Sequence, residues 1–157
     1  MFSKTSNYAF RALVLLATQE RDRFVSIREV ANKLDISFHF LTKIFQTLSQ
    51  HNIVETYRGP RGGVRLSRPP EEISLLDIAL CLEGEGFLND CILGISICSQ
   101  GLPCPLHEAW FPAKNLLHGK LASITLRELA GQYLNGEIVV ASARPDKDQR
   151  SQPKKRR

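Results

Sequence analysis

The sequence predicts a mainly α-helical protein that contains one small β-hairpin. Three observations support this fold class. Apolar residues recur at helical spacing through the first fifty residues, which predicts three successive helices. A glycine-rich turn between two strand-like runs follows at residues 53–66 and predicts the hairpin. A further helical segment runs from Pro105 to about Ala122. We therefore expect a helical head that ends in a hairpin, followed by a long C-terminal helix.

The first two helices follow from apolar spacing and from capping residues. The first is predicted at residues 6–19, with Ser6 or Asn7 as its cap. Its apolar stripe consists of Ala9, Leu13, Leu16 and Ala17. Residues Ser26–Glu29 have the form of a capping box, in which the serine hydroxyl and the glutamate carboxylate satisfy free amides at a helix start. The second helix therefore begins here and ends before the short turn Asp35–Ile36.

A third helix and the hairpin complete the head. Ser37 is expected to cap this helix. Its apolar face consists of Leu41, Ile44, Phe45 and Leu48. Two short helices joined by a tight turn are the signature of a helix-turn-helix. Strands at Ile53–Tyr57 and Val64–Leu66 flank the turn Arg58–Gly63, and this hairpin predicts the wing of a winged helix-turn-helix.

The chain is expected to have three parts. Residues 1–68 form the winged head, which Pro69–Pro70 closes. Residues 69–140 contain the cysteines, the long C-terminal helix and a last helix capped by Thr125–Glu128. Residues 141–157 are rich in charge and contain two prolines, so we expect a basic, disordered tail.

The net charge of +5 is distributed unevenly along the chain. Residues 1–68 carry eleven Lys or Arg against five Asp or Glu, whereas residues 69–143 carry three against nine. A basic head is expected of a surface that contacts phosphates, although chance clustering on solvated faces would give the same counts. The sequence contains neither an apolar run long enough for a membrane helix nor the features of a signal peptide, so we expect a cytoplasmic protein.

The third helix would lie in the major groove of DNA and present its early residues to base edges. The candidate contacts are Ser37, His39, Thr42 and Lys43. The last three share a polar face opposite the apolar one. Lys43 can bind guanine or phosphate, and Thr42 can use its hydroxyl or its methyl group. An amphipathic helix with a solvated face is the alternative interpretation.

The wing supplies a second set of candidate contacts. Its arginines are Arg58, Arg61, Arg65 and Arg68. Its glycines, Gly59, Gly62 and Gly63, permit tight backbone geometry and a close approach to a groove. Arginines on such a tip can enter a narrow minor groove, where the negative potential is deepest. The alternative is an ordinary turn with solubilising arginines, and the helix-turn-helix directly upstream favours the DNA interpretation.

Three cysteines and a histidine lie close together in the irregular segment that follows Gly84. Six residues separate Cys91 from Cys98, five separate Cys98 from Cys104, and two separate Cys104 from His107. Thiolates are soft ligands that suit iron–sulfur clusters, zinc and copper(I). The spacing lacks the Cys-x-x-Cys unit of most structural zinc sites and does not match the common ferredoxin runs. These four residues are candidate metal ligands, and a metal-free, redox-reactive loop is the alternative.

These segments together resemble the IscR/NsrR family of winged-helix iron–sulfur transcription regulators, the Rrf-two superfamily, throughout residues 1–140. The matching segments are Tyr8-Ala9, Ile36-Ser37, Phe40-Leu41, Arg58–Gly63, the cysteine trio with His107 and Ala109-Trp110, and Ile124–Leu129. The wing and the cysteine trio are the most specific of them. The resemblance implies a homodimer whose long C-terminal helices cross between subunits, and it implies binding to palindromic double-stranded DNA. Arg58 matches the wing arginine that enters the minor groove in family members.

The resemblance also implies a cofactor. In the cluster-binding branch of the family, the cysteine loop holds a 2Fe–2S or 4Fe–4S cluster whose state alters DNA affinity. The fourth ligand is a histidine matching His107 in IscR-like members. In some nitric-oxide-sensing members it is an aspartate from the partner's first helix, where this chain has Asn7. An amide is a poorer ligand than a carboxylate, which favours three cysteines with His107. The cysteine spacing does not decide the cluster type, and a 2Fe–2S cluster is expected in preference to a 4Fe–4S cluster.

We therefore expect a DNA-binding transcription regulator, acting mainly as a repressor, rather than an enzyme. An iron–sulfur cluster would control its DNA affinity in response to redox state, nitric oxide or iron supply. Neither a small-molecule substrate nor a membrane partner is expected. One alternative is a zinc-binding or metal-free thiol-switch regulator of the same fold. Another is an iron–sulfur electron-transfer protein, which would leave the basic head unexplained.

Overall fold

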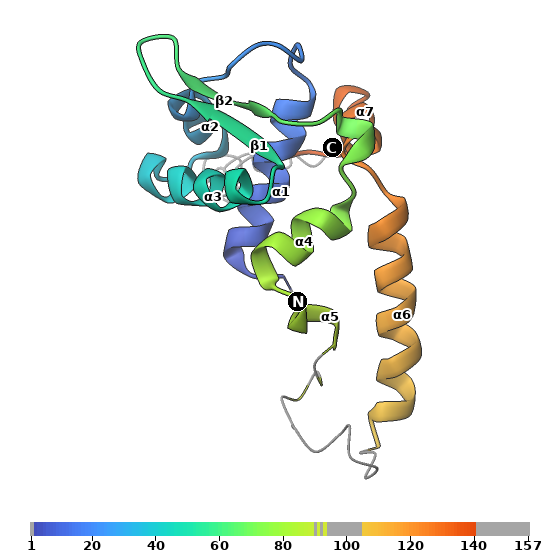
Figure 1. The fold of residues 1–157 in the computed structure, drawn as a ribbon. Helices are drawn as coiled ribbons and strands as arrows, with labels where there is room; N and C mark the ends of the chain where they lie inside the picture. The colour runs from blue at the N-terminus through green and yellow to red at the C-terminus, as the bar shows by residue number, and fades with distance from the viewer. Residues whose placement is uncertain (1, 90, 92, 94–104, 141–157) are drawn as a thin grey trace, which may run out of the picture.

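The structure is a computed structural model, and it describes residues 2–89, 91, 93 and 105–140. It confirms the predicted fold class, because the described residues form helices and one two-stranded antiparallel sheet (Figure 1). The elements in chain order are α1 (Lys4–Ala17), α2 (Ile27–Leu34), α3 (Phe38–Gln50), β1 (Val54–Tyr57), β2 (Gly63–Leu66), the 3-10 helix η1 (Pro70–Glu72), α4 (Leu75–Glu83), α5 (Gly86–Asn89), α6 (His107–Ser123) and α7 (Leu126–Leu134).

Helix α1 forms the centre of the head, and α2, α3, α4, α7 and β2 all contact it. The predicted apolar face of α3 is confirmed. Its four members, Leu41, Ile44, Phe45 and Leu48, are all buried in the core. Full burial of an aliphatic or aromatic side chain contributes about 1.5–3 kcal/mol. Packing against α1 therefore fixes which side of α3 remains available to a partner.

The two strands form the predicted hairpin, with Val54 opposite Leu66 and Tyr57 opposite Gly63. The sequence did not predict that Val25, in the segment between α1 and α2, would pair with Val64. The two residues exchange backbone hydrogen bonds, each with an N···O distance of 2.9 Å. This pairing anchors the base of the hairpin to the helical head.

Gly63 permits this close pairing, so Gly63→Ala should destabilise the fold. A Cβ atom at position 63 would lie 2.2 Å from the carbonyl oxygen of Val25. Relieving that overlap requires β2 to move away from Val25, and we expect the free energy of unfolding to fall by about 1–3 kcal/mol. Urea unfolding followed by circular dichroism measures the change.

Gly131→Ala on α7 is the matched control, because a Cβ atom there would meet nothing within 4 Å. Alanine in a helix interior should raise the free energy of unfolding by about 0.5–1 kcal/mol. Equal denaturation midpoints for Gly63→Ala and the unmodified protein would contradict the proposed role of Gly63.

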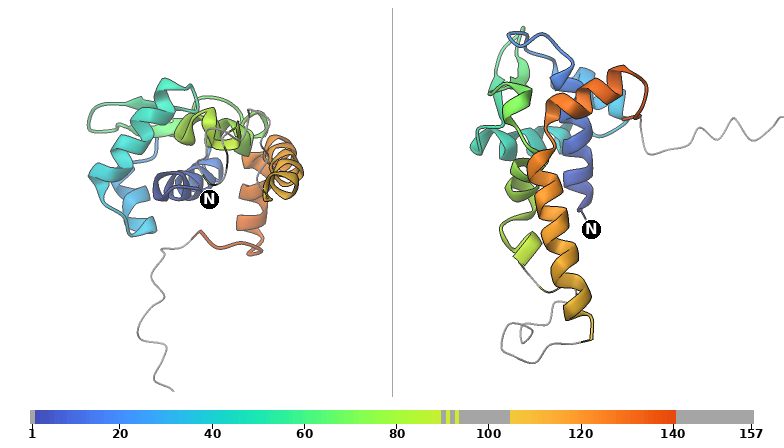
Figure 2. Two further views of the ribbon diagram at one scale, coloured as in Figure 1. Left: turned by 90° about the horizontal axis from the view of Figure 1, so that it is seen from below. Right: turned by 90° about the vertical axis from the view of Figure 1, so that its right-hand side faces the viewer.

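The C-terminal elements extend away from the head and then return to it. Helices α4 and α5 lead toward the end of the molecule opposite the wing, and α6 runs from that end back to the head beside α4, as Figures 1 and 2 show. Within α6 only Leu121 is buried. At the end of α6, Thr125 pairs with Ser74, and the predicted cap by Thr125 and Glu128 is confirmed. Leu126 is fully buried in the core, so α7 packs back onto α1. None of the helices in the described part of the chain is long and apolar enough to cross a membrane.

Several predicted element boundaries were wrong. Ser3 caps α1 by accepting a hydrogen bond from the Ser6 N–H at 3.2 Å, so the helix begins before Ser6 and Asn7. The predicted capping box at Ser26 is not formed, because the Ser26 side chain makes no capping hydrogen bond. Glu29 instead pairs with a lysine one turn later. Helix α6 begins at His107 rather than at Pro105, and the segment predicted as a loop after Gly84 contains α5.

Candidate nucleic-acid interface and metal ligands

An exposed polar stripe runs along α3 on the side opposite the core. His39, Lys43 and Gln46 are exposed at intervals of four and three residues, which places them on one helix face. Helix α3 contains no acidic residue. The stripe can therefore approach a polyanion without charge repulsion from its own helix.

The other two predicted α3 contacts are partly engaged within the helix. The Ser37 side chain caps α3 by accepting a hydrogen bond from the Phe40 N–H at 3.5 Å. The half-buried Thr42 donates its hydroxyl hydrogen to the Phe38 carbonyl oxygen at 2.8 Å. Ser37 thus retains its hydroxyl proton for an outside acceptor, whereas Thr42 can offer a partner its methyl group and an acceptor lone pair.

The wing tip is a closed turn that requires its glycines. The Gly62 N–H donates to the Gly59 carbonyl oxygen at 2.9 Å, and Gly59 has a φ of +130°. A Cβ atom on Gly62 would lie 2.3 Å from the Tyr57 carbonyl oxygen. Arg58 and Arg61 are exposed at this tip and form no ion pair within the described part of the chain. Their guanidinium groups are therefore available to an anionic partner.

The other two arginines of the predicted wing stabilise its base. The Arg65 Nε donates to Glu55 Oε1 at 2.6 Å, and the Arg65 guanidinium lies 4.5 Å from the centre of the Phe24 ring. Arg68 is 3.9 Å from Asp77 and donates to a backbone carbonyl oxygen of the loop before β1. Of the four wing arginines, only Arg58 and Arg61 at the tip form no ion pair with the described residues.

A groove of about 350 Å³ connects α3 to the wing. Thr42 and Gln46 line it from α3, Tyr57 and Arg58 line it from the wing, and Arg28 lines it from α2. The lining residues include no acidic side chain. Sequence reasoning missed both Arg28 and Gln46. The helical spacing from Lys43 could have identified Gln46, but the position of Arg28 over the Phe38 ring, 5.0 Å from its centre, depends on how α2 and α3 pack.

Two of the four predicted metal ligands lie in the described part of the chain. Cys91 is half-buried and follows α5, and His107 is the first residue of α6, with its ring 6.2 Å from the Phe111 ring. Cys98 and Cys104 lie outside the described residues. Among the residues that are described, no three His, Cys, Asp or Glu side chains gather as a metal site. Three thiolates with an imidazole remain a suitable donor set for an iron–sulfur cluster, and the four-ligand set stays a prediction.

Cys81 is partly buried against the core and is not one of the four predicted ligands. It lies on α4, and its Sγ is 3.9 Å from the Thr47 carbonyl oxygen of α3. Burial raises the pKa of its thiol to about 11. The thiolate form that binds metals is therefore disfavoured at this position.

The element that leads into the cysteine segment is attached to the N-terminus of α1. The Phe87 ring of α5 stacks on the Phe2 ring, with centroids 4.9 Å apart. Glu83, at the end of α4, accepts hydrogen bonds from the Ser3 N–H at 2.7 Å and from the Ser6 hydroxyl. Burial tends to raise the pKa of Glu83, but these hydrogen bonds outweigh it and hold the pKa below its usual value. The cysteine segment is thus linked through α5 to the central helix of the head.

The helix-turn-helix, its exposed polar stripe and the arginine-tipped hairpin define a winged-helix transcription regulator that binds DNA. The family described as Rrf2, iron-dependent transcriptional regulator, matches residues 2–132, and the chain belongs to it.

Relatives with known names agree with this assignment. The chain is 34% identical to the HTH-type transcriptional regulator NsrR of Halalkalibacterium halodurans, over 66% of this chain and 75% of that one. It is 28% identical to the HTH-type transcriptional regulator IscR of Photorhabdus laumondii, over 93% of this chain and 87% of that one. The crystal structure of the oxidised form of Staphylococcus aureus CymR superposes with a TM-score of 0.67 and 25% identity, covering 83% of this chain and 95% of that one.

Proposed function

We propose that the chain is a repressor that binds DNA through α3 and the wing together. The groove that joins the exposed α3 stripe to Arg58 carries this proposal, because it brings a helix and an arginine tip to one surface. His39, Thr42, Lys43 and Gln46 would read base edges in the major groove. Ser37 and Arg61 would bind phosphates, and Arg58 would enter the minor groove. Gly59, Gly62 and Gly63 allow the wing backbone to come close to the DNA.

We further propose that the protein is a homodimer and that its operators are palindromic. Helix α6 has 17 residues, and its side chains Phe111, Leu116 and Leu117 are 51%, 67% and 39% exposed. A helix with such side chains on its surface is stabilised by a partner that covers them. A two-fold dimer presents two heads, so its DNA site should contain two half-sites about 34–36 Å apart.

We propose that an iron–sulfur cluster, 2Fe–2S rather than 4Fe–4S, is held by Cys91, Cys98, Cys104 and His107. Such a cluster supplies a group that responds to oxidants, nitric oxide and iron supply. Cys91 follows α5 and His107 begins α6, so this ligand set would tie α5 to α6. Helix α5 is attached to α1 through the contact of Phe87 with Phe2. Binding or loss of the cluster would therefore change how α6 is held against the head.

A thiol switch without a metal is the second candidate function. The relative crystallised in an oxidised form favours it, because that protein has the same fold. The cysteine trio could also bind zinc, which would make the site structural.

Purification without oxygen tests the cluster proposal. We expect a brown protein with equal amounts of iron and sulfide and little zinc, whose DNA affinity changes when the cluster is removed by a chelator. Ultraviolet–visible spectroscopy, metal and sulfide assays, and fluorescence anisotropy with operator DNA provide the measurements. A colourless protein that gains no iron on reconstitution would refute the cluster, and bound zinc would favour the structural site. DNA affinity that depends on neither sequence nor symmetry would refute the operator proposal.

A further inference from the structure

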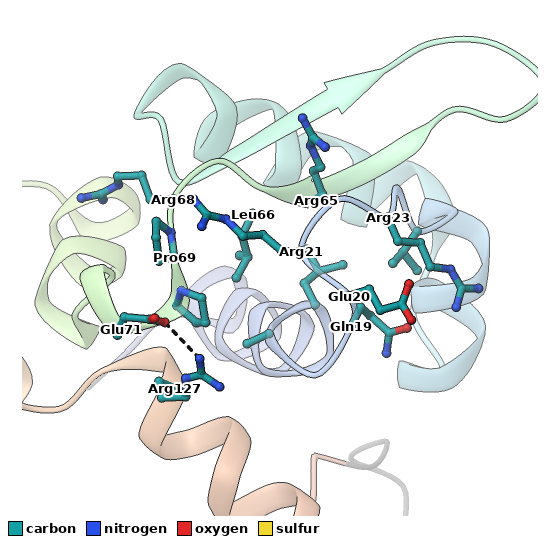
Figure 3. Close-up of a pocket in the computed structure, with 14 residues that line it drawn as sticks. Gln19, Glu20, Arg21, Arg23, Arg65, Leu66, Arg68, Pro69, Glu71 and Arg127 are labelled. Atoms are coloured by element: carbon teal, nitrogen blue, oxygen red, sulfur yellow. Dashed lines mark ion pairs between the residues drawn. The ribbon is translucent and has the colours of Figure 1, made fainter.

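A hollow of about 300 Å³ lies on the head where several segments meet (Figure 3). It is bordered by the end of α1 and the loop after it, the end of β2, η1 and the start of α7. Two glutamates line it, together with five arginines: Arg21, Arg23, Arg65, Arg68 and Arg127. This hollow shares no residue with the groove between α3 and the wing. Its volume is in the range of small-molecule sites.

The five arginines differ in how well their charges are compensated. Arg65 and Arg68 are held by the carboxylates that stabilise the base of the wing. Arg21 and Arg23 are exposed and form no ion pair in the described part of the chain. Arg127 contacts only Glu71 among the described carboxylates, at 3.5 Å. The hollow therefore contains guanidinium groups with unused hydrogen-bond donors.

The contact between Arg127 and Glu71 is weak enough to be exchanged. The two side chains are 65% and 53% exposed, and an ion pair between solvent-exposed side chains is weak because water screens both charges. The hydrogen bond that the Glu71 carboxylate accepts from its own backbone N–H contributes most to lowering its pKa. The charges of Arg127 and Arg21 lower it further. Figure 3 shows both arginines directed toward the segment that contains Glu71. They therefore approach one carboxylate from two elements, the loop after α1 and helix α7.

Part of the remaining wall of the hollow is apolar, beside Gln19 and Glu20. Leu16 and Ala17 line it from α1, and Leu66, Pro69 and Pro70 line it from the end of β2 and the start of η1. A ligand that fits both walls needs an anionic group and a short apolar body. Guanidinium groups bind carboxylates and phosphates through paired hydrogen bonds, so both of these anions suit the arginines.

We propose that this hollow binds a small organic anion, with its carboxylate or phosphate group between Arg21 and Arg127 and its apolar part against Pro69 and Pro70. The anion would replace Glu71 as the partner of Arg127. Because α7 meets the head here, the ligand would also alter how α6 and α7 are held on the head. That effect on DNA affinity rests on the proposed function, whereas binding of the anion does not.

The test uses the full-length protein without DNA and two probes, glutarate and glycerol 3-phosphate, each compared with sodium chloride at equal ionic strength. We expect one of them to shift the NMR signals of the Arg21 and Arg127 side-chain Nε–H groups along a saturating curve. Arg21→Gln and Arg127→Gln should each weaken that binding at least about tenfold, since each removes one guanidinium partner. Lys120→Gln on α6 is the matched control, because it removes an exposed positive charge outside the hollow and should leave the binding unchanged.

Saturating binding of glutarate identifies the anionic group as a carboxylate, and saturating binding of glycerol 3-phosphate identifies it as a phosphate. NMR signals that shift in proportion to the concentration of both probes, without saturating, would overturn the proposal. Saturable binding that survives both arginine substitutions would also overturn it. Arg21→Gln should retain the operator affinity of the unmodified protein when no probe is present. Failure of the anion site can thus be distinguished from failure of the DNA interface.

Discussion

Replacing Arg58 with alanine should weaken binding to every operator sequence by about 1–3 kcal/mol, roughly five- to 150-fold. Arg58 is exposed beside the closed turn of the wing and forms no ion pair in the described part of the chain. The substitution therefore removes a DNA contact without removing an internal one. The slope of log affinity against log salt concentration should fall by about one, because one cation leaves the interface. Fluorescence anisotropy titrations at several salt concentrations measure both effects.

The α3 stripe should respond differently from the wing. Lys43→Ala and Gln46→Ala remove side chains that we expect to read bases, so they should change which operator variants bind best. Lys120→Ala removes an exposed positive charge from α6 and should change neither affinity nor sequence preference. Unaltered affinity of Arg58→Ala, with an unfolding curve like that of the unmodified protein, would show that the wing tip does not contact DNA.

Replacing Cys91 with serine should abolish binding of the iron–sulfur cluster. A serine hydroxyl has a much higher pKa than a thiol and is a poor ligand for iron, so the site would lose one of its four donors. Cys81→Ser is the matched control. Burial already raises the Cys81 thiol pKa to about 11, so this residue is not expected to bind iron, and its loss should leave the cluster intact. Visible absorption and iron content per chain, measured without oxygen, separate the two variants.

The fourth ligand can be identified in the same experiment. If His107 binds the metal, His107→Ala should lower the iron content or shift the visible bands, whereas Asn7→Ala should do neither. Asn7 is an exposed residue of α1, so its replacement should preserve the fold. Full cluster content in Cys91→Ser would refute the proposed ligand set, and loss of the cluster in Asn7→Ala alone would move the fourth ligand to α1.

Local sequence signals determined most of the head. The period of Leu41, Ile44, Phe45 and Leu48 predicted both the position of α3 and its buried side. Gly59 and Gly62 predicted a tight turn, which the structure confirms, because short-range backbone geometry requires glycine at those positions. The cysteine spacing indicated a metal or redox site, and two of its members lie outside the described residues.

Contacts between residues far apart in the chain were decided only by the tertiary structure. The pairing of Val25 with Val64, the return of α7 to α1 and the attachment of Glu83 to Ser6 join segments that no local pattern relates. The same is true of the arginines. The sequence placed four of them in the wing, but only packing decided that Arg65 and Arg68 meet carboxylates while the tip arginines do not. Sequence periodicity determines which side of an element is apolar, whereas the partner of each charge depends on which elements pack together.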